Sequence, residues 1–285
     1  MTMLQHDTKI LIVGLGLIGG SYAEGLKRAG YEVGAVTRSQ KTIDYALERG
    51  LIDSGTTEPT ADYIGRFDLL VFALYPHVFL DWIDRYQAWI KPGALLTDVT
   101  GVKGAIVDRI QERLRPDLEF VGAHPMAGRE RSGVENADCS IFRGANYIVT
   151  PTPRNTPEAI ESCMELGRIL GFARISTLSP AAHDEMIGFL SQLTHCIAVA
   201  LMNCKESHHL VDFTGDSFRD LTRIARINDE MWPELFALNK TELLDQMDLF
   251  RREFERLRDA IAADDTDTVR EMMRTSTLRR SYFDK

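Results

Sequence analysis

The sequence is poor in cysteine, and its cysteines follow no disulfide or metal-ligand spacing. Among 285 residues there are four cysteines, Cys139, Cys163, Cys196 and Cys204, and none forms a Cys-x-x-Cys pair. A disulfide framework or a zinc site needs cysteines at regular, paired spacings. We therefore expect reduced thiols and no metal site built on cysteine.

The sequence also lacks an excess of positive charge and a long hydrophobic run. Its 42 acidic residues outnumber 33 basic ones, so the formal net charge is −9, which gives no electrostatic footprint for nucleic acid or an anionic membrane. Apolar runs such as Ile197–Met202 fall short of the roughly 20 residues of a membrane-spanning helix. The polar start, residues 1–8, predicts no signal peptide. We expect a cytoplasmic protein with no nucleic-acid or membrane partner.

Near its start the sequence does contain an apolar run joined to a glycine-rich turn. Residues 10–13 are followed by Gly14-Leu15-Gly16-Leu17-Ile18-Gly19, a Gly-x-Gly-x-x-Gly pattern that opens a helical sequence. The first glycine permits the tight turn, the second lets the backbone approach a pyrophosphate, and the third lets the helix pack on the strand. The pyrophosphate then binds N–H groups at the helix start, here those of Leu17 and Ile18. The pattern predicts a dinucleotide-binding site.

An acidic residue is missing where an NAD site usually has one. The second apolar run, residues 31–36, is followed by Thr37, Arg38, Ser39, Gln40 and Lys41. In NAD sites a carboxylate about 20 residues beyond the glycines binds the ribose 2′-hydroxyl. Hydroxyl groups and a guanidinium suit a 2′-phosphate instead, because arginine offers a planar fork of donors with a fixed charge. These residues favour NADP, with NAD as the alternative.

The two halves of the sequence differ in periodicity. Up to about residue 177, short apolar runs alternate with amphipathic helical patterns, which is typical of an α/β, Rossmann-type doubly wound sheet. The further expected strands are residues 68–73, 94–97, 120–123, 147–149 and 173–175. From Ser179 onward strand patterns disappear. The predicted division is a dinucleotide-binding domain over residues 1–177 and an all-helical domain over residues 178–285.

Long helices are expected in the second half, over residues 180–205 and 232–262. Helices roughly 40 Å long are too long for one small domain to cover. A homodimer that shares a helical core is the simplest way to bury them.

Chemically useful residues gather in segments outside the glycine turn. Residues 97–104 and 121–128 each follow an expected strand, at the sheet edge where doubly wound folds bind ligands. The second segment holds His124, which suits either acid–base catalysis near neutral pH or a structural role. His183 and His195 are rotated by about 120° on a helix, so they do not form a metal pair on one face. In residues 218–225, one of two neighbouring arginines could bind a carboxylate.

Together these segments resemble the prephenate/arogenate dehydrogenase family of tyrosine biosynthesis. The resemblance extends from residue 10 to about 260, and it is carried by residues 14–21 (GLGLIGGS), 98–104 (DVTGVKG), 122–128 (GAHPMAG), 190–195 (LSQLTH) and 218–225 (FRDLTRIA). In that family a Rossmann-type domain precedes an all-helical dimerisation domain. The resemblance implies oxidative decarboxylation of prephenate, or alternatively of arogenate, with hydride transfer to NAD(P)⁺ and no metal.

The resemblance also implies roles for single residues. His124 matches the histidine that bonds the substrate's ring hydroxyl, and His195 matches a second active-site histidine. Arg223 matches the arginine that binds a substrate carboxylate. Trp232 matches a tryptophan near the pocket entrance, which can be supplied across the dimer.

Other positions match the family only in part. Glu130 and Asp220 match acids that form ionic contacts around the pocket, whereas Arg129 adds a positive charge that corresponds to no fixed family residue. Relatives often have a serine near the nicotinamide where this chain has Gly101. Thr100 is the neighbouring hydroxyl that could replace it as a catalytic group.

Two other classes of function fit parts of the sequence. β-Hydroxyacid dehydrogenases and ketol-acid reductoisomerases also join a Rossmann domain to helices, but they use a catalytic lysine or metal-binding acids in the helical half, and no such acid cluster stands out here. A dinucleotide-sensing regulator without turnover would carry a degraded catalytic loop. The intact His124-Pro125 segment, together with Arg223, favours an enzyme.

Overall fold

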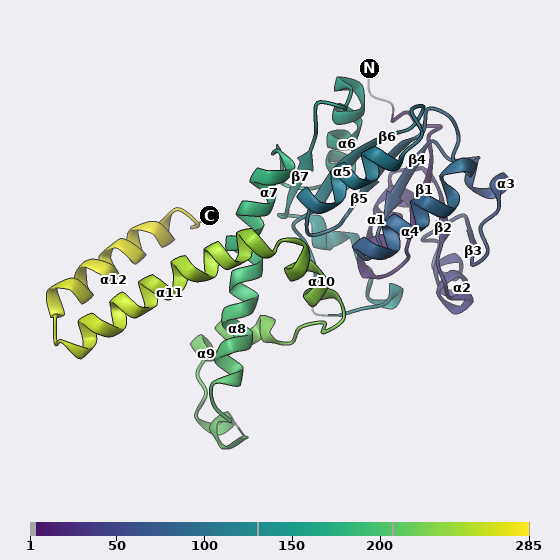
Figure 1. Cartoon of the computed structure of the whole chain (residues 1–285). Coiled ribbons are helices and arrows are strands. Elements are labelled where there is room, and N and C mark those ends of the chain that lie inside the picture. The colour runs from purple at the N-terminus through teal and green to yellow at the C-terminus, as the bar shows by residue number, and fades with distance from the viewer. Residues whose placement is uncertain (1–3, 130, 207, 285) are drawn as a thin grey trace.

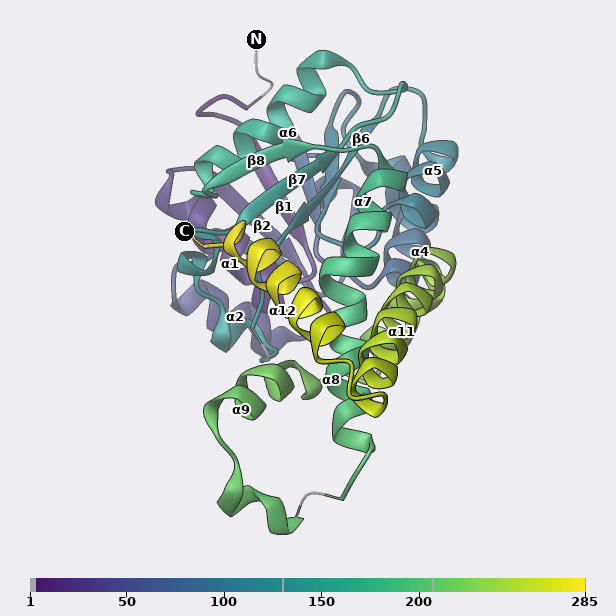
Figure 2. The ribbon, with the colours of Figure 1, turned by 90° about the vertical axis from the view of Figure 1, so that its left-hand side faces the viewer.

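The computed structural model describes residues 4–129, 131–206 and 208–284, which form a sheet-containing half followed by a helical half (Figure 1). The last two helices, α11 (Lys240–Ala262) and α12 (Thr266–Ser281), extend away from the sheet. Figure 2 shows the same ribbon from the side, with α12 running beside α11.

Eight strands form one sheet, in the order β3-β2-β1-β4-β5-β6-β7-β8. All neighbours are parallel except β6 and β7. The strands are β1 Lys9–Val13, β2 Glu32–Val36, β3 Ser54–Thr56, β4 Leu69–Phe72, β5 Leu95–Asp98, β6 Glu119–Pro125, β7 Asn146–Thr150 and β8 Arg174–Thr177. The direction of winding reverses between β1 and β4, where doubly wound sheets bind ligands. The predicted α/β doubly wound class is confirmed, and β3 is a strand that the sequence did not predict.

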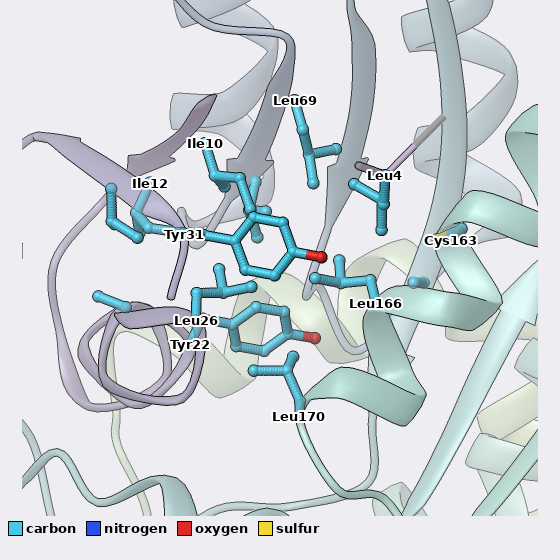
Figure 3. Close-up of a cluster of buried hydrophobic side chains, with 14 of the residues drawn as sticks. Leu4, Ile10, Ile12, Tyr22, Leu26, Tyr31, Leu69, Cys163, Leu166 and Leu170 are labelled. Carbon is cyan, nitrogen blue, oxygen red and sulfur yellow. The ribbon is translucent and has the colours of Figure 1, made fainter. Parts of the chain in front are cut away.

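Apolar side chains cover both faces of the sheet. In β1, Ile10 belongs to one buried cluster and Leu11 to another, because successive strand residues point to opposite faces. Figure 3 shows the first cluster, where Leu26 of α1 and Leu166 of α6 lie over the strands. Burial on both faces explains why β1 and β4 are nearly continuous apolar runs.

Helices connect the strands and shield these clusters. Their bounds are α1 Leu17–Arg28, α2 Gln40–Glu48, α3 Ala61–Ile64, α4 Pro76–Tyr86, α5 Gly104–Arg113 and α6 Pro157–Ile169, with short 3₁₀ turns η1 Gln87–Trp89, η2 Val134–Asn136 and η3 Cys139–Phe142. Local sequence sets several starts. The Thr156 hydroxyl accepts a hydrogen bond from the Ala159 N–H at the beginning of α6, and Pro157 occupies its first turn.

The helical half begins with a helical stretch that changes its hydrogen-bonding pattern midway. α7 (Pro180–Ile187) continues through a π-helical segment, η4 (Gly188–Leu193), into α8 (Thr194–Asn203). The rest comprises η5 His208–Phe213, α9 Asp216–Thr222, η6 Arg223–Ala225, α10 Met231–Leu238, α11 and α12. π-Helical segments are rare and are frequent at functional sites; this one separates His183 from His195.

The predicted second long helix is wrong at its start. The sequence indicates one helix over residues 232–262, but the structure interrupts it between α10 and α11, at Asn239. Asn239 is buried, and its side-chain amide donates to the Asp184 carbonyl oxygen at 2.9 Å and to Gln192 Oε1 at 2.8 Å. These long-range bonds fix the break, so local periodicity does not reveal it.

The stretch Pro180–Asn203 is long and apolar enough to cross a membrane by length and composition, although 28% of its most apolar window is buried. The sequence analysis had pointed only to shorter apolar runs. In Pro180–Asn203 the large exposed apolar side chains are Met186, Phe189 and Leu190. Exposed apolar patches often mark interaction surfaces.

Candidate active site

The glycine turn has the geometry that a dinucleotide requires. Gly14 has a φ of +96°, and a Cβ there would lie 2.3 Å from the Ala73 carbonyl oxygen. A Cβ at Gly19 would lie 2.0 Å from the Gly14 oxygen, so α1 can pack against the turn only with glycine there. At Gly16 a Cβ would meet nothing within 4 Å. Gly16 therefore lies at an open face, where a ligand can approach the backbone.

The N-terminus of α1 suits a pyrophosphate. Gly16 precedes Leu17 and Ile18 without a side-chain cap, and the first turn contains no acidic residue. First-turn N–H groups lack helical acceptors and carry the positive end of the helix dipole. The donor set and the open face at Gly16 fit a dinucleotide pyrophosphate.

The residues after β2 lie at the same edge of the sheet. The Thr37 N–H donates to the Thr56 carbonyl oxygen at 3.3 Å, and Ser39 Oγ accepts from the Thr42 N–H at 3.3 Å and caps α2. Arg38 and Lys41 are exposed. The charged side chains of Arg38 and Lys41 therefore face solvent just beyond the end of β2.

A buried ion pair forms the floor of the site. Lys103 Nζ lies 2.6 Å from Asp98 Oδ2, and both side chains are fully buried. Asp98 also accepts the Ala123 N–H at 3.0 Å and the Thr100 N–H at 3.0 Å. These bonds join the end of β5 to β6, so the ion pair fixes the loop beside His124.

The Thr100 hydroxyl is hydrogen-bonded to both members of this ion pair. Its hydroxyl bonds to Asp98, lies 3.0 Å from the Val102 carbonyl oxygen and accepts from Lys103 Nζ at 3.2 Å. The hydroxyl is thus engaged within the loop, which argues against the catalytic role expected for it. A Cβ at Gly101 would instead lie 3.9 Å from both Cε1 and Nε2 of His124. Gly101 is the loop residue that borders the histidine.

His124 is held in a chain of side chains that the sequence did not predict. At the end of β6 its Nδ1 lies 2.9 Å from Nε2 of His183. Nδ1 of His183 lies 2.7 Å from Oδ1 of Asp184. His183 and Asp184 are buried near the start of α7, so the helical half contributes directly to the site.

Asp184 also binds the loop of the sheet half. Its Oδ1 accepts the Lys103 N–H at 2.8 Å, and its Oδ2 accepts the Gly104 N–H at 2.7 Å. One carboxylate therefore fixes both the loop and His183. The sequence placed His183 and Asp184 on a helix, but nothing local indicated contacts to residues about 60 to 80 positions away.

Burial keeps both histidines neutral. Burial lowers the pKa of His124 well below 6.5, and the nearby His183 and Lys103 act in the same direction. Burial also lowers the pKa of His183, against the opposing effect of Asp184. Burial lowers the pKa of Lys103 too, while Asp98 opposes that shift. A neutral imidazole is the form that can accept a proton.

The rings of His195 and Trp232 contact each other in a tilted arrangement. Their ring centroids are 3.9 Å apart, and His195 Nδ1 lies 2.8 Å from the Ser191 carbonyl oxygen. Trp232 is on α10, which packs against the sheet half through Leu235. A Cβ at Gly101 would be 3.6 Å from Leu235 Cδ1, so α10 borders the catalytic loop.

The charged residues expected around the pocket differ in their exposure and in their ion-pair partners. Arg223 is exposed at the start of η6, and Asp220 is exposed on α9. Arg219 pairs with Asp216 at 2.6 Å. Arg129 pairs with Asp138 at 2.9 Å, which compensates much of the charge expected beside His124. Glu130 lies outside the described residues.

The fold, the glycine turn and the neutral histidine at the sheet edge define a dinucleotide-dependent oxidoreductase. The family model for the nucleotide-binding domain of prephenate dehydrogenase matches residues 22–173, and that for its dimerization domain matches residues 179–275. The chain belongs to the prephenate dehydrogenase family.

Characterised relatives carry related names. The chain is 29% identical to the prephenate dehydrogenase of Bacillus subtilis, over 96% of this chain and 76% of the relative. It is 27% identical to the cyclohexadienyl dehydrogenase of Zymomonas mobilis, over 98% of this chain and 96% of the relative.

Solved structures agree with this assignment. The prephenate dehydrogenase of Aquifex aeolicus, in complex with hydroxyphenyl propionate and NAD⁺, superposes with a TM-score of 0.90 at 27% identity, covering 99% of this chain and all of that one. The Synechocystis arogenate dehydrogenase superposes with a TM-score of 0.83 at 26% identity, covering 97% of this chain and all of that one.

Proposed function

We propose that this enzyme oxidises and decarboxylates prephenate to 4-hydroxyphenylpyruvate in tyrosine biosynthesis, in the cytoplasm. The observation that carries the proposal is the position of His124 at the end of β6. One ring nitrogen is engaged by His183, while Nε2 makes no hydrogen bond to any residue that the structure describes. A neutral imidazole with an available nitrogen suits the removal of a hydroxyl proton.

The reaction needs few groups beyond this base. The hydroxyl-bearing ring carbon gives up a hydride, and a dinucleotide held at the glycine turn would supply the acceptor. The hydroxyl proton passes to His124 Nε2. The bond to the ring carboxylate breaks with release of carbon dioxide, and its electron pair completes the aromatic ring. Aromatisation makes the reaction effectively irreversible, so catalysis consists mainly of positioning and proton removal.

Substrate recognition is assigned to the helical half. Arg223 binds a carboxylate, His195 and Trp232 provide an aromatic wall, and Asp220 supplies an ionic contact. Glu130, from the sheet half, is proposed as a further ionic contact. Prephenate is a dianion, whereas arogenate carries an added ammonium that an arginine-containing pocket repels. This charge difference favours prephenate over arogenate. Each charge-assisted hydrogen bond between an arginine and a substrate carboxylate contributes about 1.5–3 kcal/mol.

NADP is proposed as the preferred cofactor, with NAD as the alternative. Thr37, Arg38, Ser39 and Lys41 offer hydroxyl and cationic groups after β2, and none of them is an acid. The double variant Thr37→Asp, Arg38→Ala should shift kcat/KM toward NAD⁺. A wild-type enzyme with a higher kcat/KM for NAD⁺ would overturn this preference.

A homodimer is proposed through the helical half, residues 178–285, with residues 1–177 as the dinucleotide-binding domain. The match to a dimerization domain over residues 179–275 supports it. The exposed apolar side chains of α11 and α12 also support it; they are Leu244, Met247, Leu249, Phe250, Phe254, Ile261, Met273 and Leu278.

Absorbance at 340 nm tests the proposed reaction. Wild-type enzyme should reduce NADP⁺ with prephenate and release carbon dioxide in equal amount. A higher kcat/KM with arogenate would replace the proposed substrate. Absence of turnover with both substrates and both cofactors would favour a dinucleotide-sensing protein instead.

A further inference from the structure

The chain Asp184–His183–His124 has a direction that hydrogen-bond chemistry determines. An ionised carboxylate accepts hydrogen bonds and donates none. Asp184 accepts two backbone N–H groups, those of Lys103 and Gly104, so both of its oxygens act as acceptors. The ring nitrogen facing it, Nδ1 of His183, must therefore carry a hydrogen.

The same reasoning extends one residue further. With the hydrogen on Nδ1, neutral His183 has a lone pair on Nε2. That atom lies 2.9 Å from Nδ1 of His124, so Nδ1 of His124 must be the donor. Neutral His124 then carries its lone pair on Nε2, beside Gly101.

We propose that His183 and Asp184 are positioning residues that fix His124 in its Nδ1–H tautomer and stabilise the positive charge it gains during turnover. The tautomer follows from the geometry alone, whereas the effect on turnover rests on the proposed function. In the catalytic step the substrate's hydroxyl proton ends on His124 Nε2. No proton leaves Nδ1, and Asp184 stays ionised.

The surrounding charges leave Asp184 as the counter-charge for His124. Lys103 opposes a positive charge on His124, but Asp98 Oδ2 lies 2.6 Å from its ammonium and largely compensates it. His183 faces His124 as a neutral ring. Among the residues that the structure describes, Asp184 is the anion that contacts His183, through Nδ1 of that ring.

Asp184 also couples the base to the docking of the two halves. It belongs to α7 but accepts N–H groups at the start of α5. A shift of α7 relative to the sheet would therefore move His183 and the Asp98–Gly104 loop together. Orientation of His124 depends on this docking.

Two substitutions of His183 separate positioning from mere packing. His183→Gln keeps an amide oxygen that can accept from His124 and an amide N–H that can donate to Asp184, and it does not titrate. His183→Phe keeps an aromatic ring but removes both hydrogen bonds. His6→Gln, at an exposed histidine that stacks on Tyr31, serves as the matched control.

Nitrogen-15 NMR of histidine-labelled enzyme gives the direct readout, with the His124 signals assigned through His124→Asn. Wild type, His6→Gln and His183→Gln should show protonated Nδ1 and unprotonated Nε2 at His124. His183→Phe should lose this single tautomer. Protonated Nε2 at His124 in the neutral wild type would overturn the proposal, whether or not prephenate is the substrate.

Steady-state kinetics give the second readout. His183→Phe should lower kcat by about 10²-fold, the lower end of the range for impaired general-base catalysis, with little change in KM for the dinucleotide. His183→Gln should recover most of kcat. Equal kcat in the Phe and Gln variants, at either level, would contradict a positioning role.

Discussion

Lys103 is the residue whose environment most constrains the site. It is fully buried against Asp98, whereas Lys9 pairs with Glu32 at 2.9 Å with 42% of its side chain exposed. A buried pair that loses one partner leaves an uncompensated charge, while an exposed pair contributes little. The two lysines therefore form a matched comparison.

Lys103→Met should lower the free energy of unfolding by about 3–5 kcal/mol. Lys9→Met should lower it by about 0–1 kcal/mol. Urea titration of the two variants measures the difference. Equal losses would show that the Asp98–Lys103 pair is not the structural constraint described here.

The buried histidines predict how stability depends on pH. Folding lowers the pKa of both His124 and His183 below 6.5, so below pH 6.5 the unfolded chain binds protons that the folded chain does not. Stability should be complete above pH 6.5 and should fall as pH decreases, by at most about 1.4 kcal/mol per pH unit for each histidine. Urea titration between pH 5 and 7.5 tests this. The slope should be shallower in His124→Asn, and an equal slope would contradict a neutral His124.

At the scale of elements, the glycine turn separates folding from cofactor binding. Gly16→Ala places a methyl group in open space, whereas Gly19→Ala places one 2.0 Å from the Gly14 oxygen. Gly16→Ala should keep its melting temperature and lose dinucleotide affinity, because the methyl group occupies the approach to the backbone. Gly19→Ala should have both a lower melting temperature and a lower dinucleotide affinity.

Thermal melts and dinucleotide titration by protein fluorescence measure these two effects. The reading of the turn fails if Gly16→Ala binds the dinucleotide as wild type does. It also fails if Gly19→Ala has the same melting temperature as wild type.

The elements differ in how far the sequence predicts them. Strands such as β1 and β4 are buried on both faces, so their apolar runs identify them. β3 has three partly buried residues, including a glycine, and escapes detection. The break at Asn239 depends on bonds to Asp184 and Gln192, which no local pattern contains.

Some residues of the candidate site could also be predicted from the sequence, and others could not. His124 and the Asp98–Gly104 loop were predictable because strand ends in a doubly wound sheet share one edge. His183 and Asp184 reach that edge from α7, and only the docking of the two halves shows it. The role of Thr100 could not be predicted, because a loop hydroxyl can face either the ligand or its own loop, and spacing does not distinguish the two.

At the scale of the whole molecule, α11 and α12 extend from the rest of the chain (Figure 1). Both helices have exposed apolar side chains. Phe254 on α11 is 61% exposed. Such a surface is stable in water when a second copy covers it.

Light scattering should therefore give about twice the chain mass of 32.1 kDa at micromolar concentration. Phe254→Arg should shift the particle toward the monomer, because it places a charge in the covered surface. Leu47→Arg, at an exposed leucine of α2 in the other half, is the control and should stay dimeric. A wild-type mass near that of one chain would contradict the dimer.

Catalysis by His124 is the central claim, and steady-state oxidation of prephenate by His124→Asn tests it most directly. Asparagine keeps a polar side chain of smaller size but cannot accept the proton. We predict that kcat falls by about 10²–10⁴-fold, the range for loss of a general base, with KM for prephenate and for the dinucleotide nearly unchanged. Near-normal kcat in this variant would contradict the account and leave His124 with a structural role.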